Sequence, residues 1–189
     1  MQIRHIAIVL GLMLLTACNG ARDLQDAPVP LGDFKLVHNI AVAPKAQKGP
    51  LSRTATEEEL VKALTDATAE RFGRYAGARN YHFGMSIEGY VLAQPGIPLV
   101  FAPKSILIIK VTVWDDAKNL KLTKKPHQIT VLESFDQGPV VGSGYTKSAQ
   151  EQLKNLSQNA AKQIENFLVK QNKENGWFNG TAEVANVTE

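Results

Sequence analysis

Two helix-start signals, one on each side of a long stretch with a period of two, constrain the fold of this chain most. In residues 56–59 and 148–151 a hydroxyl residue is followed three positions later by glutamate, the capping-box pattern that begins an α-helix. Apolar residues recur at helical spacing after both signals. Between them, residues 81–135 alternate apolar and polar side chains, which is typical of strands. Helices and strands are therefore expected in separate stretches of the chain.

The order of these segments predicts the fold class. The expected strands cover residues 35–43, 85–91, 105–114 and 128–135, which gives the order β-α-β-β-β-α. This order favours an α+β fold, a two-layer sandwich in which two helices pack on one face of a mostly antiparallel sheet of about four strands. In the first strand, Leu36, Ile40 and Val42 are expected to share one face. A single domain over residues 34–172 is long enough to bury a core of its own.

The N-terminus has the pattern of a bacterial export signal. A charged start precedes an apolar run over residues 6–15, which is too short to cross a hydrocarbon core of about 30 Å as a helix. The run ends in Leu15-Thr16-Ala17-Cys18, which resembles the lipobox of bacterial lipoproteins. This resemblance implies that residues 1–17 are a lipoprotein signal peptide and that Cys18 is the site of lipid attachment. The alternative is an ordinary signal peptide with an incidental cysteine.

Cys18 is the only cysteine of the 189 residues, so no intramolecular disulfide can support the fold. Acyl chains on Cys18 would hold the protein on a membrane, because each buried CH₂ contributes ~0.8 kcal/mol. Asn19 follows the cysteine, which resembles lipoproteins sorted to the outer membrane, with the inner membrane as the alternative. Residues 18–33 contain two prolines without periodicity and are expected to form a flexible tether. Residues 173–189 are expected to form a poorly ordered tail.

Four features together resemble the small α+β lipoproteins of the Gram-negative envelope. They are the lipobox, Ile40-Ala-Val-Ala-Pro44, the pair Gly89-Tyr-Val and Val111-Thr-Val-Trp-Asp115, and Gly142-Ser-Gly144 before the last helix. This group includes the curli-secretion lipoprotein, the accessory lipoproteins of exopolysaccharide export and the lipopolysaccharide-assembly lipoprotein. The chain is also similar to uncharacterised alphaproteobacterial lipoproteins. The resemblance implies a periplasm-facing accessory or scaffold protein of envelope assembly or export, with an envelope protein partner or a second copy of itself.

Motifs for catalysis or metal binding are weak in this sequence. The glycine-rich stretch before Lys147 lacks the glycine that a P-loop needs, because Thr146 stands there. The mature histidines, His38, His82 and His127, lie far apart and lack the spacing of metal ligands. Asp115 and Asp116 are adjacent and would point to opposite faces of a strand. We therefore expect a non-enzymatic protein without cofactor or metal, and a periplasmic hydrolase is the weakest alternative. The net charge of +3 is below that of a typical nucleic-acid binder.

A cluster of lysines is the first candidate contact surface. Lys118, Lys121, Lys124 and Lys125 surround one expected hairpin. Such a cluster attracts anionic lipid, lipopolysaccharide or polysaccharide, which would make the protein a lipid- or glycan-binding periplasmic module. The alternative is a solvated loop that protects the edge of a sheet.

An apolar stretch is the second candidate contact surface. Ile97, Leu99, Val100 and Phe101 lie in a proline-rich connection. They are expected either to begin the next strand and be buried or, if exposed, to contact a partner or a second copy of the chain.

Overall fold

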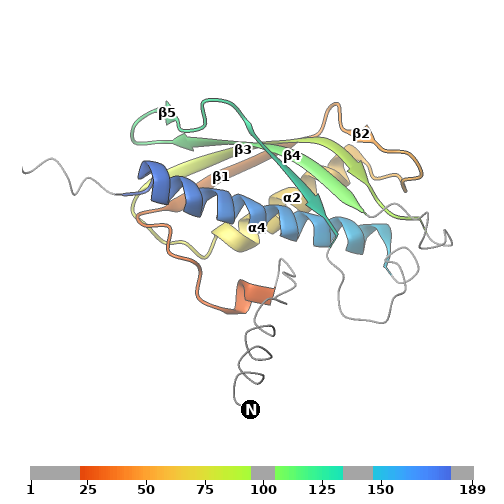
Figure 1. Ribbon diagram of the computed structural model, residues 1–189, viewed down its shortest axis with the longest axis horizontal. Helices are drawn as coiled ribbons and strands as arrows, with labels where there is room; N and C mark the ends of the chain where they lie inside the picture. Colours follow the sequence, from red (N-terminus) through yellow and green to blue (C-terminus); the bar gives the residue numbers. More distant parts are fainter. Residues whose placement is uncertain (1–21, 95–104, 134–146, 180–189) are drawn as a thin grey trace, which may run out of the picture.

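The computed structural model describes residues 22–94, 105–133 and 147–179 (Figure 1). Cys18, the expected signal peptide and the apolar stretch from Ile97 to Phe101 lie outside the described residues. The elements in chain order are η1 (Arg22–Gln25), β1 (Lys35–Val42), β2 (Gln47–Lys48), α2 (Glu57–Phe72), β3 (Asn80–Val91), β4 (Ile106–Asp115), β5 (Leu120–Lys121), β6 (His127–Leu132) and α4 (Ala149–Asn175).

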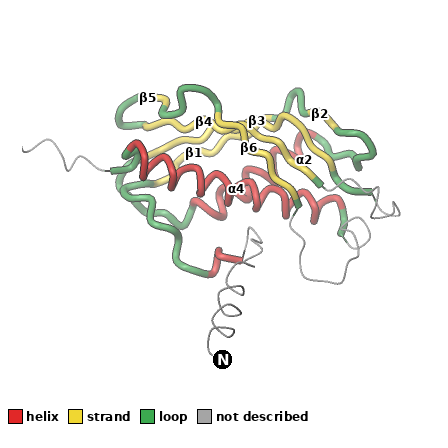
Figure 2. Tube along the Cα trace, viewed as in Figure 1, coloured by secondary structure: helices red, strands yellow, loops and turns green. Residues whose placement is uncertain are grey.

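The described residues form two layers, in which α2 and α4 cover one face of a sheet (Figures 1 and 2). The prediction of an α+β fold is confirmed, but the sheet has six strands rather than about four. The sheet is mixed, because β1 and β2 pair with β3 in parallel whereas β4 pairs with β3, β5 and β6 antiparallel. The parallel pair β1–β3 follows from the helix α2 that connects them, since parallel strands need a crossover.

Both helices begin at the predicted residues with a complete capping box. The Thr56 side chain accepts a bond from the amide of Glu59, whose carboxylate accepts one from the amide of Thr56, at 3.2 and 2.8 Å. Ser148 and Glu151 make the same reciprocal pair before α4. These bonds satisfy amide groups that the first helical turn leaves without a partner. The start of each helix is therefore set by local sequence.

An aromatic cluster fills the core where the segment before β1 meets the segment after α4. Phe34 stacks on Tyr81 at 5.1 Å between ring centroids, and Phe178 contacts Phe34 edge-on at 5.0 Å. All three residues are fully buried. Such aromatic pairs contribute about 0.5–1.5 kcal/mol beyond the area that they bury.

The segments expected to be a flexible tether and a poorly ordered tail are packed against the domain at residues 31–33 and 178. Leu31 is buried, and the amide of Asp33 donates to the carbonyl of Phe178 at 3.1 Å. Gly32 has φ of +82°, and a Cβ on it would lie 2.8 Å from the Phe178 carbonyl oxygen, so this close approach favours glycine. The polar composition and the prolines of residues 18–33 suggested a segment without contacts to the domain. Leu31 and Phe178 instead bury apolar side chains in the core, which fixes both segments to the domain.

Strand β1 differs from the prediction in the faces of its side chains. Leu36 packs against the core, whereas Ile40 and Val42 are 63% and 46% exposed on the face without helices. The pairing register of β1 and β3 shifts between Leu36 and His38. An extra residue at such a bulge moves the following side chains to the opposite face. The expectation that Leu36, Ile40 and Val42 share a face is therefore wrong.

Candidate functional site: the docked N-terminal segment

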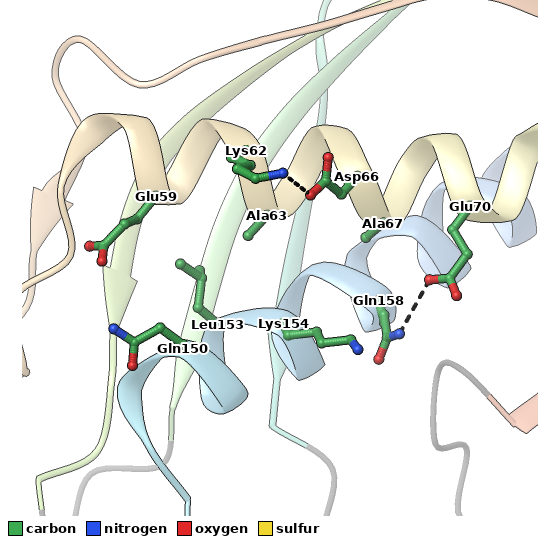
Figure 3. Close-up of a pocket in the computed structure, with 10 residues that line it drawn as sticks. All are labelled: Glu59, Lys62, Ala63, Asp66, Ala67, Glu70, Gln150, Leu153, Lys154 and Gln158. Carbon is green, nitrogen blue, oxygen red and sulfur yellow. Dashed lines mark hydrogen bonds and ion pairs between the residues drawn. The ribbon is translucent and has the colours of Figure 1, made fainter.

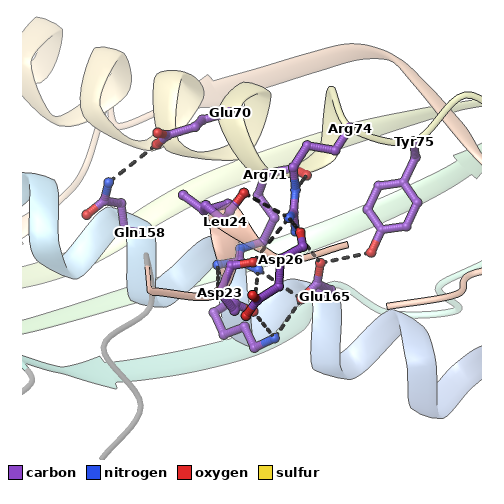
Figure 4. A network of polar contacts seen from close by, with 10 residues as sticks. Asp23, Leu24, Asp26, Glu70, Arg71, Arg74, Tyr75, Gln158 and Glu165 are labelled. Carbon is purple, nitrogen blue, oxygen red and sulfur yellow. Dashed lines mark hydrogen bonds and ion pairs between the residues drawn. The ribbon is translucent and has the colours of Figure 1, made fainter. Parts of the chain in front are cut away.

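A buried guanidinium links the two helices to the segment that follows Cys18. The side chains of Arg71 on α2 and Glu165 on α4 are 1% and 0% exposed, and they form an ion pair at 2.9 Å. Arg71 also pairs with Asp23 of η1 at 2.8 Å (Figure 4). One cation thus bridges carboxylates from two elements that are far apart in the sequence. Charge-assisted bonds of this kind are stronger than neutral ones.

Further cations surround the two carboxylates. Lys162 Nζ lies 2.5 Å from Asp23 Oδ2 and 2.8 Å from Glu165 Oε2. Arg74 pairs with Glu165 at 3.5 Å and donates to the backbone carbonyl of Asp26 at 2.9 Å. Three cations therefore face two carboxylates, which leaves both Asp23 and Glu165 compensated.

A tyrosine completes the cluster. The Tyr75 hydroxyl lies 2.8 Å from Glu165 Oε1 and 3.0 Å from the carbonyl oxygen of Val29. Tyr75 is thus in reach of both the buried carboxylate and the N-terminal segment. We call Asp23, Arg71, Arg74, Tyr75, Lys162 and Glu165 the anchor network.

The electrostatics of the anchor network keep Asp23 ionised. The hydrogen bond from the Arg71 guanidinium holds the pKa of Asp23 well below its usual range, and Lys162 acts in the same direction. Burial, followed by the hydrogen bond with Glu165, raises the pKa of the Tyr75 hydroxyl. At neutral pH Asp23 is therefore charged and Tyr75 is a neutral donor, which is the state that holds η1 on the helices.

A groove of about 500 Å³ lies beside this network, between α2 and α4 (Figure 3). Ala63, Ala67 and Leu153 line it together with charged and amide side chains. Several of these polar groups bind one another: Lys62 pairs with Asp66 at 2.6 Å, and Gln158 donates to Glu70 at 3.3 Å. The groove is open and its polar groups do not converge on one point, so it is not assigned a ligand.

The structure brings the predicted lysine cluster together at one end of the sheet. Lys118, Lys121, Lys124 and Lys125 are all exposed and surround β5. Lys118 Nζ lies 3.8 Å from Asp115 Oδ2, whereas the other three lysines have no ion-pair partner within the described ranges. In Figure 1, η1 lies on the outer side of the helices and β5 lies on the sheet side. The lysine cluster and the N-terminal segment are thus on different sides of the molecule.

The sequence contains one indication of the anchor network, namely two opposite charges within the apolar stripes of the two helices. Arg71 lies among apolar residues at helical spacing in the helix that begins after Thr56, and Glu165 adjoins Ile164 in the helix that begins after Ser148. Opposite charges at core-facing positions of two helices indicate a buried pair, because an unpaired buried charge is costly. No sequence pattern indicates that Asp23 joins this pair, and only the structure shows it.

Comparisons with known proteins show similarity of fold only. No model of a protein family matches the chain, and no curated protein sequence is similar to it. A DUF330 protein from Xanthomonas campestris is 12% identical, with 78% of this chain and 94% of that one covered and a TM-score of 0.44. A Caulobacter crescentus protein that is proposed to be a lipoprotein is 17% identical, with coverage of 74% and 90% and a TM-score of 0.33. A minor lipoprotein from Acinetobacter baumannii is 16% identical, with coverage of 69% and 93% and a TM-score of 0.31.

Neither helix of the described part of the chain combines the length and the apolar character needed to cross a membrane. None of the three similar proteins identifies a function for this chain, since the identities and TM-scores are low.

Proposed function

We propose that the protein is a lipid-anchored, non-enzymatic accessory or scaffold protein of envelope assembly or export. Acyl chains on Cys18 hold it at the periplasmic face of the outer membrane. The observation that supports this proposal is the docking of the segment after Cys18 onto α2 and α4 through the anchor network. A segment that served only as a spacer would not need a buried ion pair.

The anchor network would limit how far the domain can move from a membrane that holds Cys18. Three residues separate Cys18 from Arg22. An extended chain spans at most about 3.6 Å per residue, so the Cα atoms of Cys18 and Arg22 are no more than roughly 15 Å apart. The helical side would therefore stay close to the bilayer, and the open face of the sheet would point away from it. A defined orientation of this kind suits a protein that presents a surface to other envelope components.

The resemblance of the sequence to curli-secretion, exopolysaccharide-export and lipopolysaccharide-assembly lipoproteins also supports this proposal. Its partner would be an envelope protein or a second copy of the chain. Recovery of the lipidated protein from detergent extracts of envelopes tests the scaffold role. Repeated recovery without any envelope partner would contradict it.

A second candidate function is a lipid- or glycan-binding module that uses the lysine cluster. The exposure of Lys121, Lys124 and Lys125 without an ion-pair partner among the described residues favours it. Because β5 and η1 lie on different sides of the helices, these lysines would meet a free glycan or a facing surface rather than the bilayer that holds the anchor.

Substitution of the anchor residue tests the leading proposal. We expect Cys18→Ser either to release the protein from membrane fractions or to block its processing, because serine cannot form the thioether with the lipid. The measurement is membrane fractionation with a carbonate wash, together with the apparent mass of the protein. As a matched control, Asn19→Gln keeps the cysteine and should leave membrane association and processing unchanged. Unaltered retention and processing of Cys18→Ser would contradict lipid anchoring.

A further inference from the structure

Two histidines that are 44 residues apart in the sequence lie side by side on the open face of the sheet. His38 of β1 and His82 of β3 are register partners in the parallel pair. Their Nδ1 atoms are 3.0 Å apart, and their ring centroids are 4.9 Å apart with an angle of 33° between the planes. His38 is exposed and the His82 side chain is 23% exposed. Two imidazole nitrogens thus face each other at a surface that solvent reaches.

A carboxylate fixes one of the two rings. Asp116, directly after β4, has its Oδ1 atom 3.1 Å from Nε2 of His82. When Asp116 accepts a hydrogen bond from the Nε2–H group, the neutral His82 ring keeps a lone pair on Nδ1, the atom that faces His38. A carboxylate that orients a histidine in this way is the usual outer partner of a metal-binding histidine.

We propose that His38 and His82 form a two-histidine site for a divalent transition metal ion, with Asp116 as the residue that orients His82. His38 places its ring proton on Nε2, and both Nδ1 lone pairs then bind the ion. Imidazole nitrogen suits copper, nickel and zinc ions.

The distance between the nitrogens indicates which ion fits. With metal–nitrogen bonds of about 2.0–2.1 Å, nitrogens 3.0 Å apart subtend roughly 90–97° at the metal. Such an angle matches neighbouring positions of a tetragonal copper or nickel centre, whereas tetrahedral zinc needs about 3.3 Å between the nitrogens. The general order of affinities also favours copper over nickel and zinc. Cu²⁺ is therefore expected to bind most tightly.

The surroundings leave room for the other ligands of the ion. Gly84 follows His82 on the same face of β3, and nothing lies within 4 Å of the place where its Cβ would be. No group of three or more His, Cys, Asp or Glu side chains within the described ranges is arranged to hold a metal. The remaining coordination positions therefore fall to water or to a donor from another molecule, and the affinity of the site is set by two side chains.

Metal titration of the processed, lipidated protein in detergent tests this site. Calorimetry with CuCl₂, NiCl₂ and ZnCl₂ at neutral pH should give one site that binds Cu²⁺ most tightly. The electron paramagnetic resonance spectrum of the Cu²⁺ form should show two coordinated nitrogens. His38→Ala or His82→Ala should remove one of them and reduce the affinity by more than 100-fold. Asp116→Asn should reduce the affinity by about 10- to 100-fold, the range for loss of an orienting partner.

His127 supplies the matched control. It is also on a strand, but its ring stacks on Phe167 at 3.9 Å between centroids, and it pairs with Val111 rather than with a residue beside His82. His127→Ala should leave the Cu²⁺ affinity and spectrum unchanged. Circular dichroism of each variant separates loss of the site from loss of the fold. The proposal is overturned if Cu²⁺ does not bind, or if His38→Ala and His82→Ala variants that are folded bind it as tightly as the unaltered protein.

Discussion

The anchor network and the lysine cluster are both rich in positive charge, but the charges of the first are paired and largely buried, whereas those of the second are exposed. In the anchor network, Arg71 is buried and Glu165 is fully enclosed, so every charge has a partner from another element. In the lysine cluster, Lys121, Lys124 and Lys125 are exposed and have no ion-pair partner within the described residues. The first region holds three segments of chain together, whereas the second leaves its charge available to solvent and ligands. Their effects on stability should differ accordingly.

The largest effect is expected for Arg71→Ala. This change removes the buried cation that pairs with both Glu165 and Asp23. Because Lys162 and Tyr75 still contact Glu165, the loss in the free energy of unfolding should approach but not exceed the roughly 3–5 kcal/mol of a buried charge left without any partner. Urea denaturation followed by circular dichroism measures it. Lys62→Ala is the control on the same helix, because the exposed pair of Lys62 and Asp66 contributes no more than about 0.5 kcal/mol. Equal losses for the two variants would contradict a structural role of the anchor network.

An intermediate and pH-dependent effect is expected for Asp23→Asn. The side chain of Asp23 is partly exposed, so the expected loss at neutral pH is about 1–2 kcal/mol. Because Arg71 lowers the pKa of Asp23 in the folded state, its contribution is complete above the unfolded pKa of about 3.9 and is lost as the pH falls toward the folded value. The difference in stability between the two proteins should therefore be smaller at pH 3 than at pH 7.

Hydrogen exchange gives a second measurement of the Asp23→Asn variant. Amides in residues 22–33 should exchange faster than in the unaltered protein if Asp23 holds this segment on the helices. Unchanged exchange there, or a stability difference that grows as the pH is lowered, would contradict the assignment.

The smallest effect on stability is expected for the triple change of Lys121, Lys124 and Lys125 to Glu. Exposed substitutions away from special features usually alter the free energy of unfolding by less than about 0.5 kcal/mol. If the lysine cluster binds anionic ligands, the same change should abolish binding to lipopolysaccharide or to vesicles with anionic lipid. Sedimentation with the vesicles measures it, and unchanged binding would dismiss the second candidate function.

The sequence predicted the features that depend on neighbouring residues. Thr56 with Glu59 and Ser148 with Glu151 start the helices as expected, because a capping box lies within four residues. The two-layer α+β arrangement followed from the order of the segments. The parallel pairing of β1 with β3 was not predicted, although a strand, a helix and a strand in succession often give this pairing.

Features that depend on distant residues needed the structure. His38 and His82 become neighbours only through the parallel pair, and a bulge after Leu36 decides which side chains of β1 face solvent. Arg71 and Glu165 are 94 positions apart in the chain. Local patterns do not determine such register and pairing, because both depend on how complete strands and helices pack.

The contact between Gly32 and Phe178 brings the segment before β1 next to the segment after α4. The side-chain amide of Asn172 donates a hydrogen bond to the carbonyl of Leu31, and its oxygen accepts one from the amide of Phe178, so these two segments hold each other. A reporter fused after Asn179 would emerge beside Asp33 rather than at the far end of the molecule.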